Sequence, residues 1–370
     1  MLGSLFSFEY WGYFILVLSS VMALVQLSRS TDTVLYGTET RVIGWFLTIL
    51  TILYIGLRPL ELYGDSYLYS TIFRLVQTGI WETLPKISSE SLWAEIEEFF
   101  IKNSTNQMWY LFIAAVYVGG IAFICRKVFP YHYTLAFIFS ITAMSFFTYG
   151  TNGLRQGFAT SMALVAIPLI KSPGRTEENE ATPLREIILG WAIMSSSIYI
   201  HRSNIALIFG IIAAYVLKNT RLNCIIWLCS IGLGLILKDA VLNVLGELSG
   251  DFRLSYYGNL EDASYYGEAR FRWDFILYSA VPIALGWWFL VKEKFEDRFY
   301  AWLLNIYILV NAGWVVINNI AFSNRIAYIS WILYPILLLY PFVKFDFSDH
   351  QGKFIAMLLV GYTLFAYVML

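Results

Sequence analysis

Long apolar runs separated by short polar segments recur along almost the whole of this 370-residue chain. Because a helix needs about 20 apolar residues to cross a bilayer, this pattern is typical of a chain that folds mainly in lipid. The composition agrees, since 58% of the residues are hydrophobic and only 14% are charged. The candidate spans lie near residues 8–27, 42–57, 107–125, 132–148, 153–170, 185–200, 203–217, 222–237, 273–291, 300–318, 325–343 and 354–370. Several are short, so we expect 10–12 transmembrane helices in one all-α, polytopic membrane domain over residues 1–370.

The charge balance and the motifs exclude several classes of ligand. A net charge of -1 gives no reason to expect nucleic acid, which binds to basic surfaces. The sequence has no phosphate loop, dinucleotide fingerprint or metal motif, so we predict no cofactor and no metal. An acidic amphipathic helix explains the run of Glu95, Glu97 and Glu98. The three cysteines lie in or beside apolar runs and show no zinc or disulfide pattern.

Basic residues are distributed unevenly between the two predicted sides of the membrane. One set of short loops holds 14 of the 25 Lys and Arg residues, which identifies that side as cytoplasmic and places both termini outside. These loops are 28–41, 126–131, 171–184 with Arg185, 218–221, 292–299 and 344–353. The outward side holds eight arginines and only three lysines. A guanidinium group suits bidentate capture of phosphate or carboxylate, so we infer an extracytoplasmic anionic ligand. The alternative is that these arginines anchor the interface or form structural ion pairs.

Asn152, Arg155 and Gln156 lie at the predicted start of a span, spaced i, i+3 and i+4 as on one helical face. A helix N-terminus already offers free N–H groups and partial positive charge, so an arginine there completes an anion site suited to phosphate. The alternative is that Asn152 caps the helix and Arg155 lies among the lipid headgroups.

The segment from Arg58 to Tyr69 also mixes charged residues with tyrosines. Asp65 and Tyr69 are four residues apart and would share a helix face. A partly buried Asp65 could act as a general base, or it could cap the helix that follows.

His201 and Ser203 lie in the outward turn after residues 185–200. Histidine has an ordinary pKa near working pH, which makes it suited to acid–base chemistry, although a histidine in a turn often only binds a carbonyl. Arg325 and Tyr328, spaced i, i+3, lie in a later outward turn rich in asparagine. Two long outward loops are expected at 58–106 and 238–272, and the second contains Arg270 and Arg272 among several tyrosines.

In these residues the chain resembles the EpsG family of bacterial exopolysaccharide polymerases, relatives of the Wzy O-antigen polymerases. The similarity covers most of the length and rests on four places in a fixed order. They are Arg58 with Gly64-Asp65 and Tyr69, Asn152-x-x-Arg155-Gln156, His201-x-Ser203, and Arg325-x-x-Tyr328. Residues 238–272 resemble the large extracytoplasmic loop of such polymerases without a residue-by-residue match.

The resemblance implies a glycosyltransferase of polysaccharide biosynthesis that joins undecaprenyl-diphosphate-linked oligosaccharide repeat units on the outer face of the bacterial cytoplasmic (inner) membrane. The lipid diphosphate would be the leaving group, and the fold would be compatible with a GT-C-like architecture. A chain-length regulator and a flippase of the same pathway would be further partners. Arg155 and Arg325 would bind the diphosphate, with Arg58 or Arg270 and Arg272 assisting, because fixed cations stabilise developing negative charge. His201 or Asp65 would be the base, and the sequence does not choose between them.

Two other functions remain open at this stage. A transporter or flippase of lipid-linked glycans would use the same arginines without bond-making, but it should carry charges near the bilayer midplane and show repeats with broken helices. A non-catalytic scaffold of a polysaccharide assembly complex would tolerate the loss of Arg155 or His201.

Overall fold

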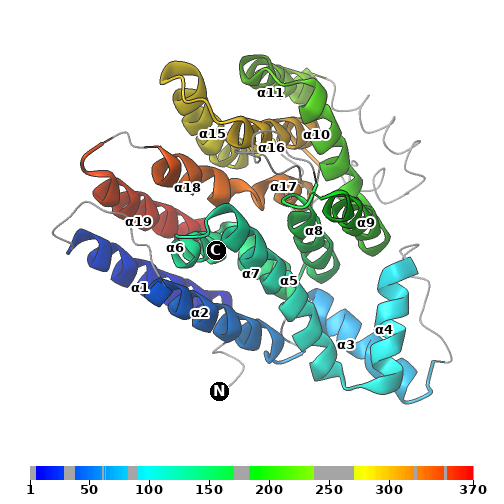
Figure 1. Cartoon of the computed structure of the whole chain (residues 1–370). Coiled ribbons are helices and arrows are strands. Elements are labelled where there is room, and N and C mark those ends of the chain that lie inside the picture. The colour runs from blue at the N-terminus through cyan, green and yellow to red at the C-terminus, as the bar shows by residue number, and fades with distance from the viewer. Residues whose placement is uncertain are drawn as a thin grey trace. The chain divides into compact units, whose positions relative to one another are not determined.

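The computed structural model describes residues 6–28, 38–60, 62, 64–81, 91–170, 183–236, 271–320, 323–345 and 348–369. All regular secondary structure within these ranges is helical, which confirms the predicted all-α class. The chain divides into two compact units. The first comprises Met1–Ser172, Thr176–Ile205 and Leu339–Leu370, and the second comprises Pro173–Arg175 and Ala206–Leu338. Helix labels follow Figure 1.

The first unit contains helices from both ends of the chain. They are α1 (Phe8–Leu27), α2 (Thr38–Gly56), α3 (Gly64–Gln77), α4 (Ser91–Asn103), α5 (Asn106–Val128), α6 (Tyr133–Thr142), α7 (Met144–Thr151), α8 (Leu154–Ala166), α9 (Leu184–Ile200), the 3-10 turn η2 (Arg202–Asn204) and α19 (Gln351–Met369). α1 packs along α19, α2 along α5, and α8 between α5 and α9. Figure 1 shows α3 and α4 beside the end at which α5 begins. These two helices lie in the predicted outward loop 58–106, and they make the described part of that loop mainly helical.

The second unit is built around α16 (Arg298–Val316), which packs against α11 (Thr220–Ile236) and α17 (Asn324–Trp331). Its other helices are α10 (Ile205–Val216), α15 (Trp273–Trp287), the π-helical turn η3 (Trp288–Lys292) and α18 (Tyr334–Lys344), which continues into the first unit. Buried Asn311 accepts a hydrogen bond from Trp227 Nε1 at 2.7 Å and donates to Ser279 and Ser330. This satisfied polar network fixes the register of the helices that carry it.

Six helical segments among the described residues are long and apolar enough to cross a bilayer: Phe8–Leu27, Asn106–Val128, Trp273–Lys292, Arg298–Val316, Asn324–Lys344 and Gln351–Val368. The pair α6 and α7 would form a seventh span, bent by 75° at Ala143. Three shorter apolar helices, Arg41–Gly56, Arg202–Val216 and Thr220–Ile236, account for part of the difference from the predicted 10–12. The difference arises because a count of apolar runs also includes segments whose helices are too short to cross the membrane alone.

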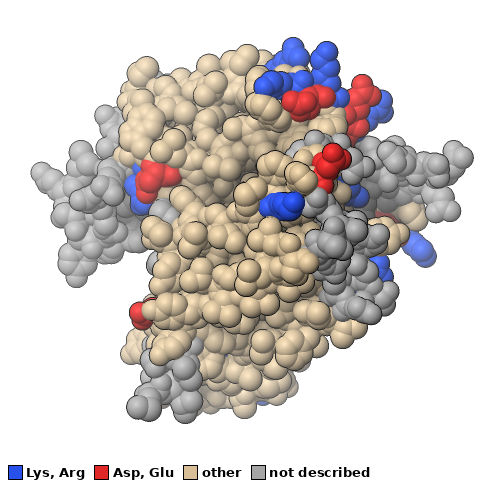
Figure 2. All heavy atoms as spheres, turned by 90° about the vertical axis from the view of Figure 1, so that its left-hand side faces the viewer, with Lys and Arg blue, Asp and Glu red and all other residues tan. Residues whose placement is uncertain are grey.

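The described surface is largely apolar. Figure 2 shows a face on which charged side chains form only small groups between broad uncharged areas. Large aliphatic side chains are highly exposed in both units, as at Val17 in α1 and Val216 in α10. Such surface is unfavourable in water and matches a hydrocarbon environment. The protein is therefore a multi-pass membrane protein.

Two glycines allow α5 to approach its neighbours closely. A Cβ at Gly56, the last residue of α2, would lie 2.8 Å from Leu111 Cα in α5. A Cβ at Gly120 in α5 would lie 2.8 Å from the Ser161 carbonyl oxygen in α8. Small residues at such positions let helix backbones pack tightly in a membrane. Both contacts fix α5 between the two helices that lead to the polar residues described next.

Candidate functional site

Eight of the residues predicted from the sequence belong to the first unit, and a series of contacts connects them. We call this group, together with Glu97, the Arg155 cluster: Arg58, Asp65, Tyr69, Asn152, Arg155, Gln156, His201 and Ser203.

Arg58 lies just beyond α2 and is only 1% exposed. Its guanidinium donates hydrogen bonds to the Ile55 carbonyl, to Ser66 Oγ at 2.7 Å and to the Thr151 carbonyl at 3.3 Å. Its Cζ also lies 5.0 Å from the centre of the Tyr110 ring. These contacts join the end of α2 to α3, α5 and α7. The sequence predicted that Arg58 contacts the substrate. Its burial and its hydrogen bonds instead suit it to hold these helices together.

The start of α5 supplies further polar contacts that the sequence did not reveal. The Tyr110 hydroxyl donates to the Ser66 carbonyl at 2.6 Å, and Asn106 Nδ2 donates to Ser70 Oγ at 2.8 Å. Gln107 Nε2 donates to the Gly56 carbonyl at 2.7 Å. α3 is thus hydrogen-bonded to a membrane-spanning helix. The signal available in the sequence was the adjacent Asn106 and Gln107 at a helix start, which also fits simple exposure to water.

Asn152 connects α3 to the turn between α7 and α8. Its Oδ1 accepts a hydrogen bond from the Asp65 backbone N–H at 3.0 Å. Asp65 lies in the first turn of α3 and is partly buried, and Asn152 supplies the capping oxygen from a distant segment. Asp65 lies inside the first turn of α3 and not at the residue before it, and the placement of Asn152 on one helical face with Arg155 is wrong. Gly153 interrupts the helix, and α8 begins at Leu154.

Arg155 and Gln156 are the second and third residues of α8, as a site at a helix N-terminus requires. Arg155 is half-buried, and its Cζ lies 5.7 Å from the centre of the Tyr69 ring. Gln156 is 5% exposed, and its Nε2 lies 3.5 Å from Ser203 Oγ. The first turn of α8 therefore contacts both α3 and the η2 turn.

His201 lies between α9 and η2, and its ring is fixed by Ser203. The His201 Nδ1 atom is 2.6 Å from Ser203 Oγ and also accepts the Ser203 backbone N–H at 3.4 Å. A backbone N–H can only donate, so Nδ1 carries a lone pair and a neutral ring has its proton on Nε2. In this arrangement Nε2–H is the hydrogen-bond donor of the ring.

Glu97 in α4 is a member of the cluster that the sequence interpretation missed. Glu95 and Glu98 are exposed, as an acidic amphipathic helix requires, but Glu97 is only 5% exposed. It lies on the buried face of α4 with Trp93 and Ile101, within an aromatic core that includes Tyr69 and Trp109. The spacing of Trp93, Glu97 and Ile101 at i, i+4 and i+8 is the signal in the sequence that places Glu97 on the apolar face. The neighbouring glutamates hide this signal, because an exposed acidic helix face accounts for them equally well.

Burial raises the pKa of the Glu97 carboxyl group from 4.5 to about 7, although the positive charge of Arg155 and the Trp93 indole act in the opposite direction. Its Oε1 atom has no hydrogen-bond partner among the described residues. A carboxyl group that titrates near neutral pH beside an arginine is typical of a functional site, though structural ion pairs show it too.

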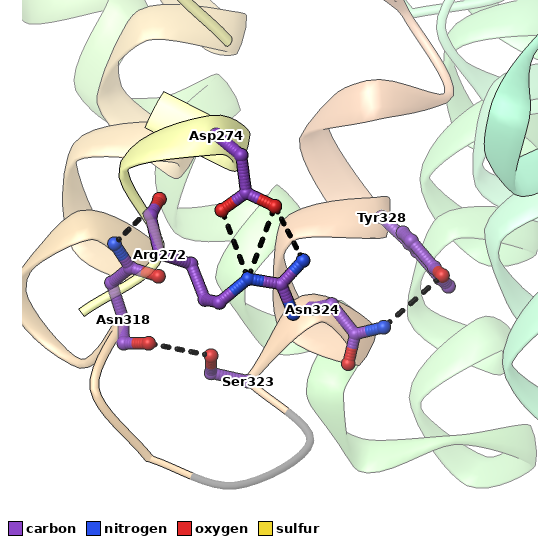
Figure 3. Close-up of polar contacts among 6 residues, drawn as sticks. All are labelled: Arg272, Asp274, Asn318, Ser323, Asn324 and Tyr328. Carbon is purple, nitrogen blue, oxygen red and sulfur yellow. Dashed lines mark hydrogen bonds and ion pairs between the residues drawn. The ribbon is translucent and has the colours of Figure 1, made fainter. Parts of the chain in front are cut away.

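The remaining predicted residues belong to the second unit. Arg272 forms an ion pair with Asp274 (Figure 3). Its Nε donates to Asp274 Oδ1 at 2.9 Å, and its Nη2 donates to Oδ2 at 2.6 Å. Arg325 is exposed on α17, and Tyr328, three residues further on, accepts a hydrogen bond from Asn324 at 3.2 Å. Arg270 and most of the predicted loop 238–272 lie outside the described residues.

These features define an all-helical, multi-pass membrane protein in which an arginine, an amide and a histidine meet at the start of a helix. The chain belongs to the EpsG family, which it matches over residues 41–370. Family membership makes it a membrane protein of polysaccharide biosynthesis. No curated protein and no solved structure matches the chain.

Proposed function

We propose that the protein is a polysaccharide polymerase that moves a growing glycan from undecaprenyl diphosphate onto the next lipid-linked repeat unit. The bond between the anomeric carbon and the diphosphate oxygen breaks, and a bond to the acceptor hydroxyl oxygen forms. The acceptor proton passes to a base, and the lipid diphosphate leaves. We place this reaction at the outer face of the bacterial cytoplasmic membrane.

The observation that carries the proposal is the position of Arg155 in the first turn of α8. The guanidinium is held beside Tyr69 and remains half-buried, and the helix start adds N–H groups and partial positive charge. A diphosphate that leaves with concentrated negative charge would be stabilised by such fixed groups. We assign Arg155 to the diphosphate and Asn152 to holding α3 in place.

The acceptor needs a group that exchanges its proton. His201 and Asp65 are the candidates, because both are only partly buried and both lie beside residues that contact α8. The neutral His201 ring can donate a hydrogen bond from Nε2–H to an oxygen of the leaving diphosphate, or it can accept the acceptor proton only if Nδ1 exchanges its present partner, whereas the Asp65 carboxylate suits removal of the acceptor proton directly. Glu97 is almost fully buried, so we assign it an indirect role through Arg155.

We propose substrate contacts for Arg325, which is exposed on α17, and for Tyr328 one turn further on, which is buried and accepts a hydrogen bond from Asn324. Arg272 is less suited to this role, because Asp274 occupies two of its donors. A transporter would use a broken helix, and α6 and α7 form one. This pair contains no charged residue, which argues against a transporter of a charged ligand. A flippase would be expected to use such a break to hold the charged ligand.

The test is an assay of purified, reconstituted protein with undecaprenyl-diphosphate-linked repeat units, read as polymer length on a gel. We expect polymer from the wild type and a roughly 100- to 1,000-fold lower rate from Arg155→Ala, as for loss of one transition-state donor. Arg74→Ala is the matched control, because Arg74 is an exposed arginine of the same unit. No polymer from wild-type protein with verified substrate would refute the polymerase, and equal rates for both variants would refute the role of Arg155.

A further inference from the structure

A basic cavity lies where α2 begins and α5 ends. Its volume is about 470 Å³, and Arg41, Trp45, Arg126, Lys127 and Tyr133 are among the residues that line it. Among the described residues that line it, none is acidic. Three cations thus surround a space large enough for a small anionic group.

Aromatic rings hold these cations in place. Arg126 Cζ lies 5.6 Å from the centre of the Trp45 ring, and Lys127 Nζ lies 5.7 Å from that of Phe123. Arg41 Cζ lies 5.7 Å from the centre of the Tyr131 ring. The Arg41 Nε atom is buried and has no hydrogen-bond partner within the described ranges. A buried donor without a partner is costly, so a ligand oxygen that accepts from it would be favoured.

The walls of the cavity come from closely packed helices. Tyr133 at the start of α6 shares a 2.6 Å hydrogen bond with Thr48 of α2. A Cβ at Gly44 would lie 2.7 Å from the same tyrosine ring. The cavity is therefore a built feature between α2, α5 and α6, and not a gap beside a loose side chain.

The cavity and the Arg155 cluster are at opposite ends of the same two helices. Gln107 near the start of α5 contacts the end of α2 beside Arg58, whereas Arg126 and Lys127 lie at the other end of α5. At 1.5 Å per residue, the 23 residues of α5 extend over about 34 Å, roughly the thickness of the bilayer core. A ligand in this cavity is therefore distinct from one bound at Arg155.

We propose that this cavity binds the phosphodiester headgroup of an anionic membrane phospholipid. Basic pockets between transmembrane helices hold such headgroups, and the amphipathic rings of Trp45 and Tyr133 are suited to the depth at which headgroups lie. The proposal does not depend on the polymerase reaction.

The experiment is native mass spectrometry of the full-length protein released from mild detergent, titrated with phosphatidylglycerol. Phosphatidylcholine and inorganic phosphate are titrated in parallel. Arg126→Gln/Lys127→Gln should weaken the first bound phosphatidylglycerol about 30-fold, equivalent to about 2 kcal/mol for two cations near the surface. Lys292→Gln/Lys294→Gln is the matched control, since Lys292 also lies over an aromatic ring, that of Trp288. We expect it to leave the affinity unchanged.

Equal affinity of the wild type and the cavity variant would overturn the proposal. Equal binding of phosphatidylcholine would overturn the anionic selectivity, and displacement of the lipid by inorganic phosphate would overturn the assignment to a lipid. If the double variant does not fold, Lys127→Gln alone should still weaken binding about 5-fold, and an unchanged affinity there would also refute the site.

Discussion

Replacing Glu97 with glutamine should change how the stability of the protein depends on pH. The pKa of this carboxyl group rises from 4.5 to about 7 on folding because burial penalises its charged form. Between these two values the folded state holds a proton that the unfolded state has lost. The free energy of unfolding therefore decreases as pH rises from 4.5 to 7, and the decrease is complete above pH 7.

The size of the effect follows from the shift. One pKa unit corresponds to about 1.4 kcal/mol, so a carboxyl shifted from 4.5 to about 7 costs roughly 3 kcal/mol of stability at pH 8. Glutamine keeps the shape of the side chain and cannot ionise. The difference in unfolding free energy between Glu97→Gln and the wild type should therefore increase by about 3 kcal/mol between pH 4.5 and pH 8. The loss of attraction to Arg155 opposes this gain and is already included in the pKa.

The measurement is reversible unfolding from dodecylmaltoside micelles by titration with SDS, followed by tryptophan fluorescence at several pH values. Glu95→Gln is the control, because Glu95 is exposed on the same helix. His132, whose pKa burial lowers to about 4, is present in every variant and cancels in the difference. Parallel curves for Glu97→Gln and the wild type, or the same change in the Glu95 control, would refute the buried, titrating carboxyl group.

Two further predictions concern α5. Gly120→Ala should destabilise the protein by about 1–3 kcal/mol because the added Cβ meets the Ser161 backbone at 2.8 Å, whereas Gly119→Ala, with nothing within 4 Å, should have little effect. Thermal unfolding of the two variants compares them directly, and equal midpoints would contradict the close approach. Tyr110→Phe removes the hydrogen bond to the Ser66 carbonyl and should cost about 1–3 kcal/mol in the SDS titration, since a buried acceptor loses its donor. A stability equal to the wild type would show that this carbonyl finds another donor.

The helical character of the chain and much of the Arg155 cluster could be predicted from the sequence. Apolar periodicity identifies the helices, and the clusters around Arg58, Arg155 and His201 lie at their ends, where the chain turns. The number of membrane spans is harder to predict, because of short helices such as α10 and α11. An apolar run of 12–17 residues reads as a span, although its helix is too short to cross the bilayer alone.

The details of the cluster depend on packing, which the sequence does not display. The sequence predicts Asn152 as a cap of the helix that follows it. Gly153 instead separates α7 from α8, and the Asn152 side-chain oxygen accepts a hydrogen bond from α3. Glu97 reads as one of three solvated carboxylates, yet the face of α4 that carries it is buried. Helical spacing alone does not decide which face of a short amphipathic helix meets the protein when the membrane and water are both available.

The buried position of Arg58 has a consequence for the synthesis of the chain. Two of its hydrogen-bond partners, Ile55 and Ser66, are near it in sequence, but the Thr151 carbonyl is 93 residues downstream. At about 5–20 residues per second, a ribosome needs roughly 5–20 s to reach that residue. During this interval α2 has already been synthesised, and the Arg58 guanidinium just beyond it has only its local acceptors, water and lipid headgroups. A nascent chain that stops before α7 therefore lacks one of the acceptors that the Arg58 guanidinium has in the finished protein.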